Sequence, residues 1–88
     1  MDLLGRRWAL RILWELRTEA TGPRALLDRI EGLSSSVLYD RLRELGEAGL
    51  VEQSPDGYRL TATGRLLGDA IAPLSAWADH WAAVLRDR

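Results

Sequence analysis

The spacing of apolar residues predicts two helices in the first third of the chain. In residues 2–18, four apolar positions recur at offsets of three and four residues, which is the spacing of one helix face. These positions are Ala9, Ile12, Leu13 and Leu16. A second, shorter helix is expected over residues 23–30, because the fixed φ angle of Pro23 suits a first helical turn.

A third helix is predicted over residues 34–48, with one apolar face and one polar face. Leu38, Leu42 and Leu45 are four and three residues apart and would point toward the core. The hydroxyl of Ser34 is expected to cap the free N–H groups of the first turn. At about 100° per residue, the face opposite the leucines carries polar residues. They are Ser36, Asp40, Arg43 and Glu47, with Tyr39 at the edge.

The pattern then changes from helix to strand and back to helix. A short hairpin is expected over residues 50–60, because Ser54-Pro55-Asp56-Gly57 has the chemistry of a tight turn. Thr61 is expected to cap a long last helix over residues 61–86. Pro73 lies inside this helix and predicts a kink. Apolar residues alternate spacings of four and three along it, as in a heptad seam. The seam consists of Leu67, Ile71, Leu74, Ala78, Trp81 and Leu85.

The order helix, helix, helix, hairpin, helix is that of a winged helix-turn-helix. We therefore expect residues 1–88 to form a single winged-helix domain that is mainly α-helical with a small β-hairpin wing, an α+β arrangement. The last helix is longer than the small core can cover. Its exposed apolar seam predicts dimerisation with a second copy of the chain.

Composition removes several classes of function. The 88 residues are 47% hydrophobic, which suits one small domain and is too apolar for a disordered chain. With no cysteine and the single histidine His80, neither thiol chemistry nor a histidine-rich metal site is available. No glycine-rich phosphate loop is present. We expect a protein that is not an enzyme, needs no cofactor and, lacking an apolar run of about 20 residues, is cytoplasmic without a membrane partner.

Several motifs resemble the HxlR-type winged-helix transcriptional regulators. The likeness is strongest in the Leu-Arg-Glu-Leu block at residues 42–45, the Leu-Thr-x-x-Gly turn at residues 60–64, and the spacing of Trp77 and Trp81. It extends to Leu3-Leu4-Gly5-Arg6-Arg7-Trp8 at the start of the chain, so it covers nearly the whole sequence.

The resemblance implies a bacterial regulator that binds a two-fold DNA operator as a homodimer. One third helix would enter each major groove, with half-sites about 34 Å apart and the wing beside the backbone. The DNA-facing positions that the resemblance implies are Ser34, Ser35, Ser36, Tyr39, Asp40 and Arg43, together with Arg59 on the wing.

The charges leave a second function open. The chain has a net charge of −1, and the wing is short with an acidic tip at Asp56. A carboxylate such as Asp40 repels phosphate, although it can accept a hydrogen bond from cytosine. Capping alone would also account for the serines that start the third helix. The alternative is therefore a winged-helix scaffold that has lost DNA binding and acts as a protein- or small-molecule-binding module.

Four tryptophans are many for a chain of this length. We expect them in the core or in a dimer interface, where their large apolar area is useful. In a dimer, the Trp77 and Trp81 pairs could line a flat slot for an aromatic small-molecule effector. The residues assigned to the interface or slot are Leu67, Ile71, Leu74, Trp77, Trp81, Leu85, Trp8 and Trp14.

Overall fold

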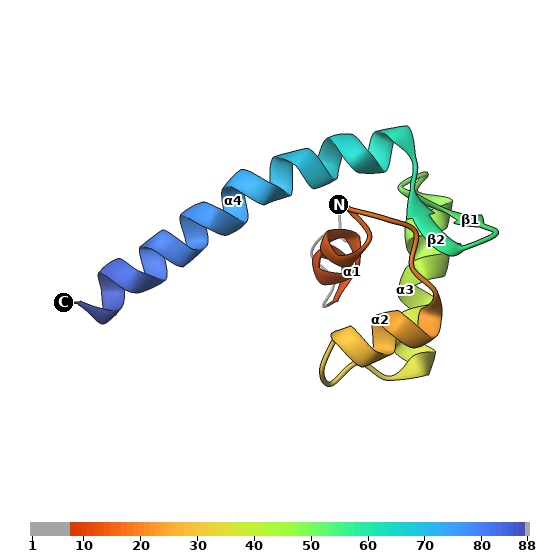
Figure 1. Cartoon of the computed structure of the whole chain (residues 1–88), viewed down its shortest axis with the longest axis horizontal. Helices are drawn as coiled ribbons and strands as arrows, with labels where there is room; N and C mark the ends of the chain where they lie inside the picture. The colour runs from red at the N-terminus through yellow and green to blue at the C-terminus, as the bar shows by residue number, and fades with distance from the viewer. Residues whose placement is uncertain (1–7, 88) are drawn as a thin grey trace.

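A computed structural model describes residues 8–87 of the chain. Within them lie the helices α1 (Ala9–Glu15), α2 (Pro23–Arg29), α3 (Ser35–Glu47) and α4 (Ala62–Arg86), and the strands β1 (Val51–Ser54) and β2 (Gly57–Leu60). In Figure 1 the first three helices and the hairpin gather into one body, and α4 extends away from it. The mainly helical winged helix-turn-helix predicted from the sequence is confirmed.

The first helix is shorter at its C-terminal end than predicted. It was expected to continue to residue 18 but ends at Glu15, with Leu16 as the C-cap; residues 2–7 lie outside the described residues. The last turn tightens, because the N–H of Arg17 donates to the carbonyl of Trp14 only three residues earlier, and the chain then runs to Thr21 beside the hairpin. The N–H of Thr21 donates to the carbonyl of Tyr58, and the Thr21 carbonyl accepts from the N–H of Tyr58, both at 2.9 Å. This bridge adds a third extended segment beside β2, which the sequence pattern did not predict.

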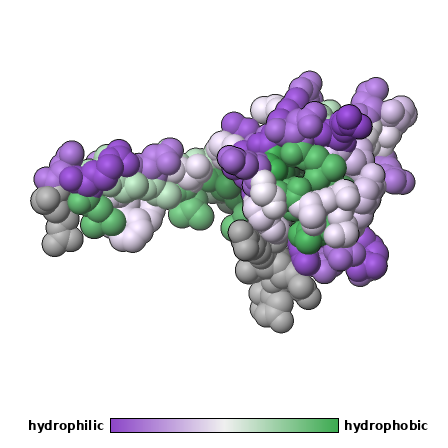
Figure 2. All heavy atoms as spheres, turned by 90° about the horizontal axis from the view of Figure 1, so that it is seen from below, coloured by the Kyte–Doolittle hydropathy of each residue, from purple (hydrophilic) through white to green (hydrophobic). Residues whose placement is uncertain are grey.

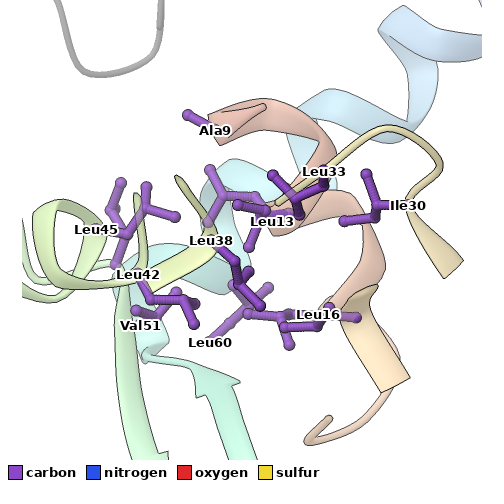
Figure 3. Close-up of a cluster of buried hydrophobic side chains, with 13 residues drawn as sticks. Ala9, Leu13, Leu16, Ile30, Leu33, Leu38, Leu42, Leu45, Val51 and Leu60 are labelled. Carbon is purple, nitrogen blue, oxygen red and sulfur yellow. The ribbon is translucent and has the colours of Figure 1, made fainter. Parts of the chain in front are cut away.

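The core forms where α1, α2, α3 and the hairpin meet. Figure 3 shows the α3 residues Leu38, Leu42 and Leu45 beside Leu13 of α1 and Leu60 of β2. All five side chains are buried, which confirms the apolar face predicted for the third helix. Burying a leucine side chain stabilises a fold by about 1.5–3 kcal/mol, so this stripe holds α3 in a fixed rotation.

Both ends of α3 are closed by local hydrogen bonds. The Ser34 hydroxyl accepts from the N–H of Val37 at 3.3 Å, as predicted for the N-cap. At the other end Gly49 adopts a positive φ of 77°, a conformation that glycine reaches without strain. The N–H of Gly49 donates to the carbonyl of Gly46, and that of Leu50 to the carbonyl of Leu45. This pairing is a Schellman motif, and it turns the chain into β1.

The start of α4 is fastened to the end of α3. The Thr61 hydroxyl accepts from the N–H of Gly64 at 3.0 Å and donates to the carbonyl of Gly49 at 2.6 Å. A side chain at Gly64 has no room, because its Cβ would lie about 2.0 Å from the carbonyl oxygen of Leu50. The Leu-Thr-x-x-Gly turn is therefore a close junction between α3, the wing and α4.

Beyond this junction α4 continues as one helix through Pro73, and Figure 1 shows its blue end far from the other elements. Leu67 and Ile71 pack against the core. From Leu74 onward the large apolar residues are exposed. In the described structure, the second half of α4 therefore has no apolar surface of its own chain to cover it.

The junction gives a prediction about stability. Gly64→Ala should destabilise the fold by about 3 kcal/mol or more, because the added methyl meets a backbone oxygen that cannot move freely. The matched control is Gly46→Ala within α3, where the nearest atom to the new Cβ is 3.9 Å away. That change should stabilise by about 0.5–1 kcal/mol. Urea unfolding of both variants checks this, and equal stabilities would contradict the close junction.

Candidate nucleic-acid interface

The polar residues predicted to face DNA lie together on the exposed side of α3. Ser35, Ser36, Tyr39, Asp40 and Arg43 are all exposed, as is the N-cap residue Ser34. The buried leucines occupy the opposite side of the same helix. The structure therefore presents one face of α3 outward over its whole length and keeps the other face in the core.

The serines at the start of α3 also interact with one another. The Ser34 and Ser36 hydroxyl oxygens are 3.4 Å apart, and the Ser34 hydroxyl is engaged with the N–H of Val37. Capping is thus a demonstrated role for Ser34. The Ser35 side chain is exposed at the first turn of the helix, where backbone N–H groups point outward and favour anions.

The arginine on the exposed face of α3 pairs with an acid one turn earlier. A terminal nitrogen of Arg43 lies 3.5 Å from a carboxylate oxygen of Asp40, and both side chains are more than half exposed. Arg41 forms a similar i,i+3 pair with Glu44 at 2.7 Å, in a more buried position. These contacts match the ordinary role of surface charges on a helix.

The wing arginine is paired more tightly. Arg59 donates from Nε and Nη2 to one carboxylate oxygen of Glu52, at 2.9 and 2.7 Å. The two residues face each other across the hairpin, because the antiparallel register aligns Glu52 with Arg59. Both side chains remain about half exposed. Arg59 was expected on the wing surface, whereas its pairing with Glu52 was not predicted from the sequence.

A hollow of about 330 Å³ separates α3 from the wing. Tyr39 and Arg43 line it from α3, and Gln53 and Tyr58 line it from the hairpin. The Gln53 amide donates to the Tyr58 hydroxyl at 3.2 Å. Sequence reasoning missed Gln53 and Tyr58, although the signal was present: a turn over residues 54–57 places these two residues opposite each other.

A second exposed surface runs along α4. Leu74 and Trp77 are 59% and 57% exposed, and Trp81 and Leu85 are also exposed. The Trp77 and Trp81 rings stack with centroids 5.7 Å apart and planes 13° apart. Figure 2 shows apolar residues along one edge of the projecting helix and polar residues along the opposite edge.

Two exposed residues on α4 were absent from the predicted seam. Leu66 is 72% exposed, and Val84 is also exposed. Each directly precedes a seam residue, Leu67 and Leu85 respectively, so each lies about 100° from it around the helix. The apolar stripe is therefore wider than the seam alone indicated. A search for apolar residues flanking the seam would have found both.

The other two tryptophans lie nearer the body. Trp8 packs against the core. The Arg17 guanidinium lies 3.6 Å from the centre of the Trp14 ring, a cation–π contact. Trp14 also borders a shallow hollow of about 390 Å³ between α1 and α4, together with Leu10, Ile71 and Ser75. Among residues 8–87, the two tryptophan rings that stack on each other are those of Trp77 and Trp81.

Residues 8–87 contain no group of three side chains suited to hold a metal ion. Within the same range, no helix is long and apolar enough to cross a membrane.

Comparison with known proteins identifies the family. The model of the HxlR-like helix-turn-helix family matches residues 3–85. A Bacillus subtilis protein named as the uncharacterized HTH-type transcriptional regulator YvaP is 30% identical, over 92% of this chain and 82% of its own length. The regulator Mb3122 of Mycobacterium bovis is 38% identical over 92% of this chain. The chain spans about half of that protein, 55% of its length.

Solved structures agree in fold. The quinone-bound form of YodB from B. subtilis superposes with a TM-score of 0.81 and 32% identity, over 90% of both chains. A possible HxlR family transcriptional factor from Thermoplasma volcanium gives a TM-score of 0.85 and 25% identity, over 93% of this chain and 80% of that one. The chain therefore belongs to the HxlR-like helix-turn-helix family, a family of DNA-binding transcriptional regulators.

Proposed function

We propose that the protein is a homodimeric regulator that places one α3 helix of each subunit in the major groove of a two-fold operator. The observation that carries the proposal is the exposed polar face of α3, held outward by the buried leucine stripe behind it. A helix of this kind beside a wing is the geometry with which winged helix-turn-helix proteins read DNA.

The dimer would form through the second half of α4. Leu74, Trp77, Trp81 and Leu85 lie along one stripe and are exposed in the single chain. A contiguous apolar stripe with aromatic residues is typical of a subunit interface. A second copy of the same helix covers it best, because two-fold pairing lets each chain bury the same residues.

Leu74→Glu should convert the dimer to a monomer without unfolding it, because this side chain lies beyond the part of α4 that packs on the core. The control is Ala76→Glu, which adds the same charge about 160° away on the exposed, opposite face. Sedimentation equilibrium should give twice the 9.9 kDa chain mass for the native protein and the control. A native protein that sediments as a monomer would contradict the proposed interface.

On DNA, the α3 residues would divide the contacts between bases and phosphates. Arg43 would donate to the O6 and N7 acceptors of a guanine or to a phosphate. Ser35, Ser36 and Tyr39 would donate to phosphate oxygens and fix the register, with Ser34 as the cap nearest to the backbone. Asp40 would accept from the amino group of a cytosine. Arg59 would approach the backbone from the wing.

Fluorescence anisotropy with the DNA upstream of the protein's own gene tests this arrangement. We expect selective binding over a scrambled duplex, with an affinity that falls as salt rises. Arg43→Ala should weaken operator binding by about 1–3 kcal/mol, the worth of a bidentate base contact. Arg24→Ala, an exposed arginine on α2, is the matched control and should have a smaller effect. Failure to bind either duplex at about 50 mM salt, where phosphate attraction is strong, would reject this function.

A specific observation favours a second candidate function. Arg43 and Arg59, the two arginines assigned to DNA, both lie beside carboxylates. A face neutralised in this way also suits a protein or small-molecule partner, as expected of a scaffold that has lost DNA binding. Absence of DNA binding in the titration above would favour this second function.

An aromatic effector would act through the α4 helices. The stacked Trp77 and Trp81 rings offer a flat apolar surface, and the similar protein YodB has been crystallised with a quinone. Because this chain has no cysteine, a quinone could not be held here through a thiol adduct. The ligand would instead stack on the rings and change the distance between the two α3 helices of the dimer.

Titration with a benzoquinone should quench tryptophan fluorescence to saturation at a defined ligand concentration. Trp77→Leu removes half of the stacked pair and should abolish the saturable part of the quenching. N-acetyltryptophanamide serves as the control for collisional quenching. If the protein shows only the unsaturable quenching of this control compound, the effector proposal fails.

A further inference from the structure

We propose that Asp40 and Glu52 are specificity-determining residues: each holds an arginine of the DNA-facing surface in a neutral pair and thereby lowers sequence-independent binding to DNA. This inference rests on the proposed function, since it concerns how the same face discriminates among DNA sequences. It explains why a surface expected to meet phosphate carries carboxylates beside two of its arginines.

The geometry of the Glu52–Arg59 pair is fixed by the backbone. The residues are direct cross-strand partners in the hairpin, and two guanidinium nitrogens reach the same carboxylate oxygen. The carboxylate therefore needs no movement of the wing to neutralise the arginine. Any approach of Arg59 to a phosphate brings the negative charge of Glu52 with it or requires the pair to separate.

The Asp40–Arg43 pair repeats this arrangement on α3. The two side chains are one helical turn apart on the outward face, with a separation of 3.5 Å. A guanidinium carries five N–H donors, and only one terminal nitrogen of Arg43 lies near the Asp40 carboxylate, so most of its donors stay available. Arg43 and Asp40 could thus meet a guanine and a cytosine edge together, because one donates and the other accepts.

Neither pair is placed to stabilise the fold. All four side chains are between 43% and 66% exposed, and pairs this exposed contribute little to stability because water and salt screen them. We therefore expect the two carboxylates to affect DNA binding rather than the stability of the fold. An arginine that binds phosphate normally releases counterions, and this release supplies most non-specific affinity. An arginine already paired with a carboxylate releases fewer counterions from DNA. The affinity of the protein for DNA then depends more on contacts with the bases.

The test compares charge removal at paired and unpaired acids. Glu52→Gln and Asp40→Asn remove one charge beside an arginine and preserve the side-chain shape. The controls are Asp56→Asn at the tip of the same hairpin and Glu47→Gln on the same face of α3. Both control residues are exposed, and no arginine partner is found for either within residues 8–87. The probes are a random-sequence duplex of about 30 base pairs and the upstream DNA.

Each test variant should bind the random duplex about tenfold more tightly at 50 mM salt, and its log–log salt dependence should steepen by about 0.9 per subunit, as for one added phosphate contact. Between 50 and 200 mM salt this slope corresponds to an additional loss of affinity of about 3.5-fold for each subunit, or about 12-fold for the dimer. Each control should change binding less than twofold. Discrimination in favour of the upstream DNA should fall in Glu52→Gln and Asp40→Asn, while their melting temperatures stay unchanged.

Equal gains in affinity for the random duplex in test and control variants would overturn the inference, because the change in net charge alone would then account for these gains. No gain in Glu52→Gln and Asp40→Asn would overturn it as well. The proposed operator function fails separately, if the native protein binds upstream and random DNA equally. If the native protein and all four variants bind neither duplex at 50 mM salt, both proposals fall.

Discussion

The structure depends on the packing of three leucines of α3, Leu38, Leu42 and Leu45, into the space between α1, α2 and the hairpin. In a domain this small few side chains can be fully buried, so each contributes a large share of the stability. The stripe also sets the rotation of α3 about its own axis. That rotation decides which residues face outward, and the surface from Ser35 to Arg43 is a consequence of it.

A second constraint connects this helix to the rest of the molecule. The chain leaves α3 through the positive φ of Gly49, forms the wing, and returns to the same point, where Thr61 caps α4 and donates to the Gly49 carbonyl. The absence of a side chain at Gly64 allows α4 to start against Leu50. The start of α4 is therefore fixed to the end of α3 by the Thr61 hydroxyl, by the N–H of Thr61, which donates to the Leu50 carbonyl, and by the close approach of Gly64 to Leu50.

Features governed by local spacing were predictable from the sequence. The leucine stripe, the Ser34 and Thr61 caps and the Ser54–Gly57 turn each depend on residues a few positions apart, and all are present. The Thr21–Tyr58 bridge joins residues distant in sequence through a single pair, so no periodicity indicates it. The neutralisation of Arg59 by Glu52 depends on the hairpin register, because only this register places the two residues opposite each other. The assignment of Ser35, Tyr39 and Arg43 to DNA stays a prediction.

We propose that two copies of α3, held by paired α4 helices, read a two-fold site on DNA. Hydroxyl-radical footprinting of the protein on its upstream DNA tests it most directly, because it reports where both subunits touch the backbone. We expect two protected segments related by a two-fold axis and centred about one helical turn, or 34 Å, apart on one face of the duplex. A single asymmetric protected segment, or uniform protection along the duplex, would contradict it.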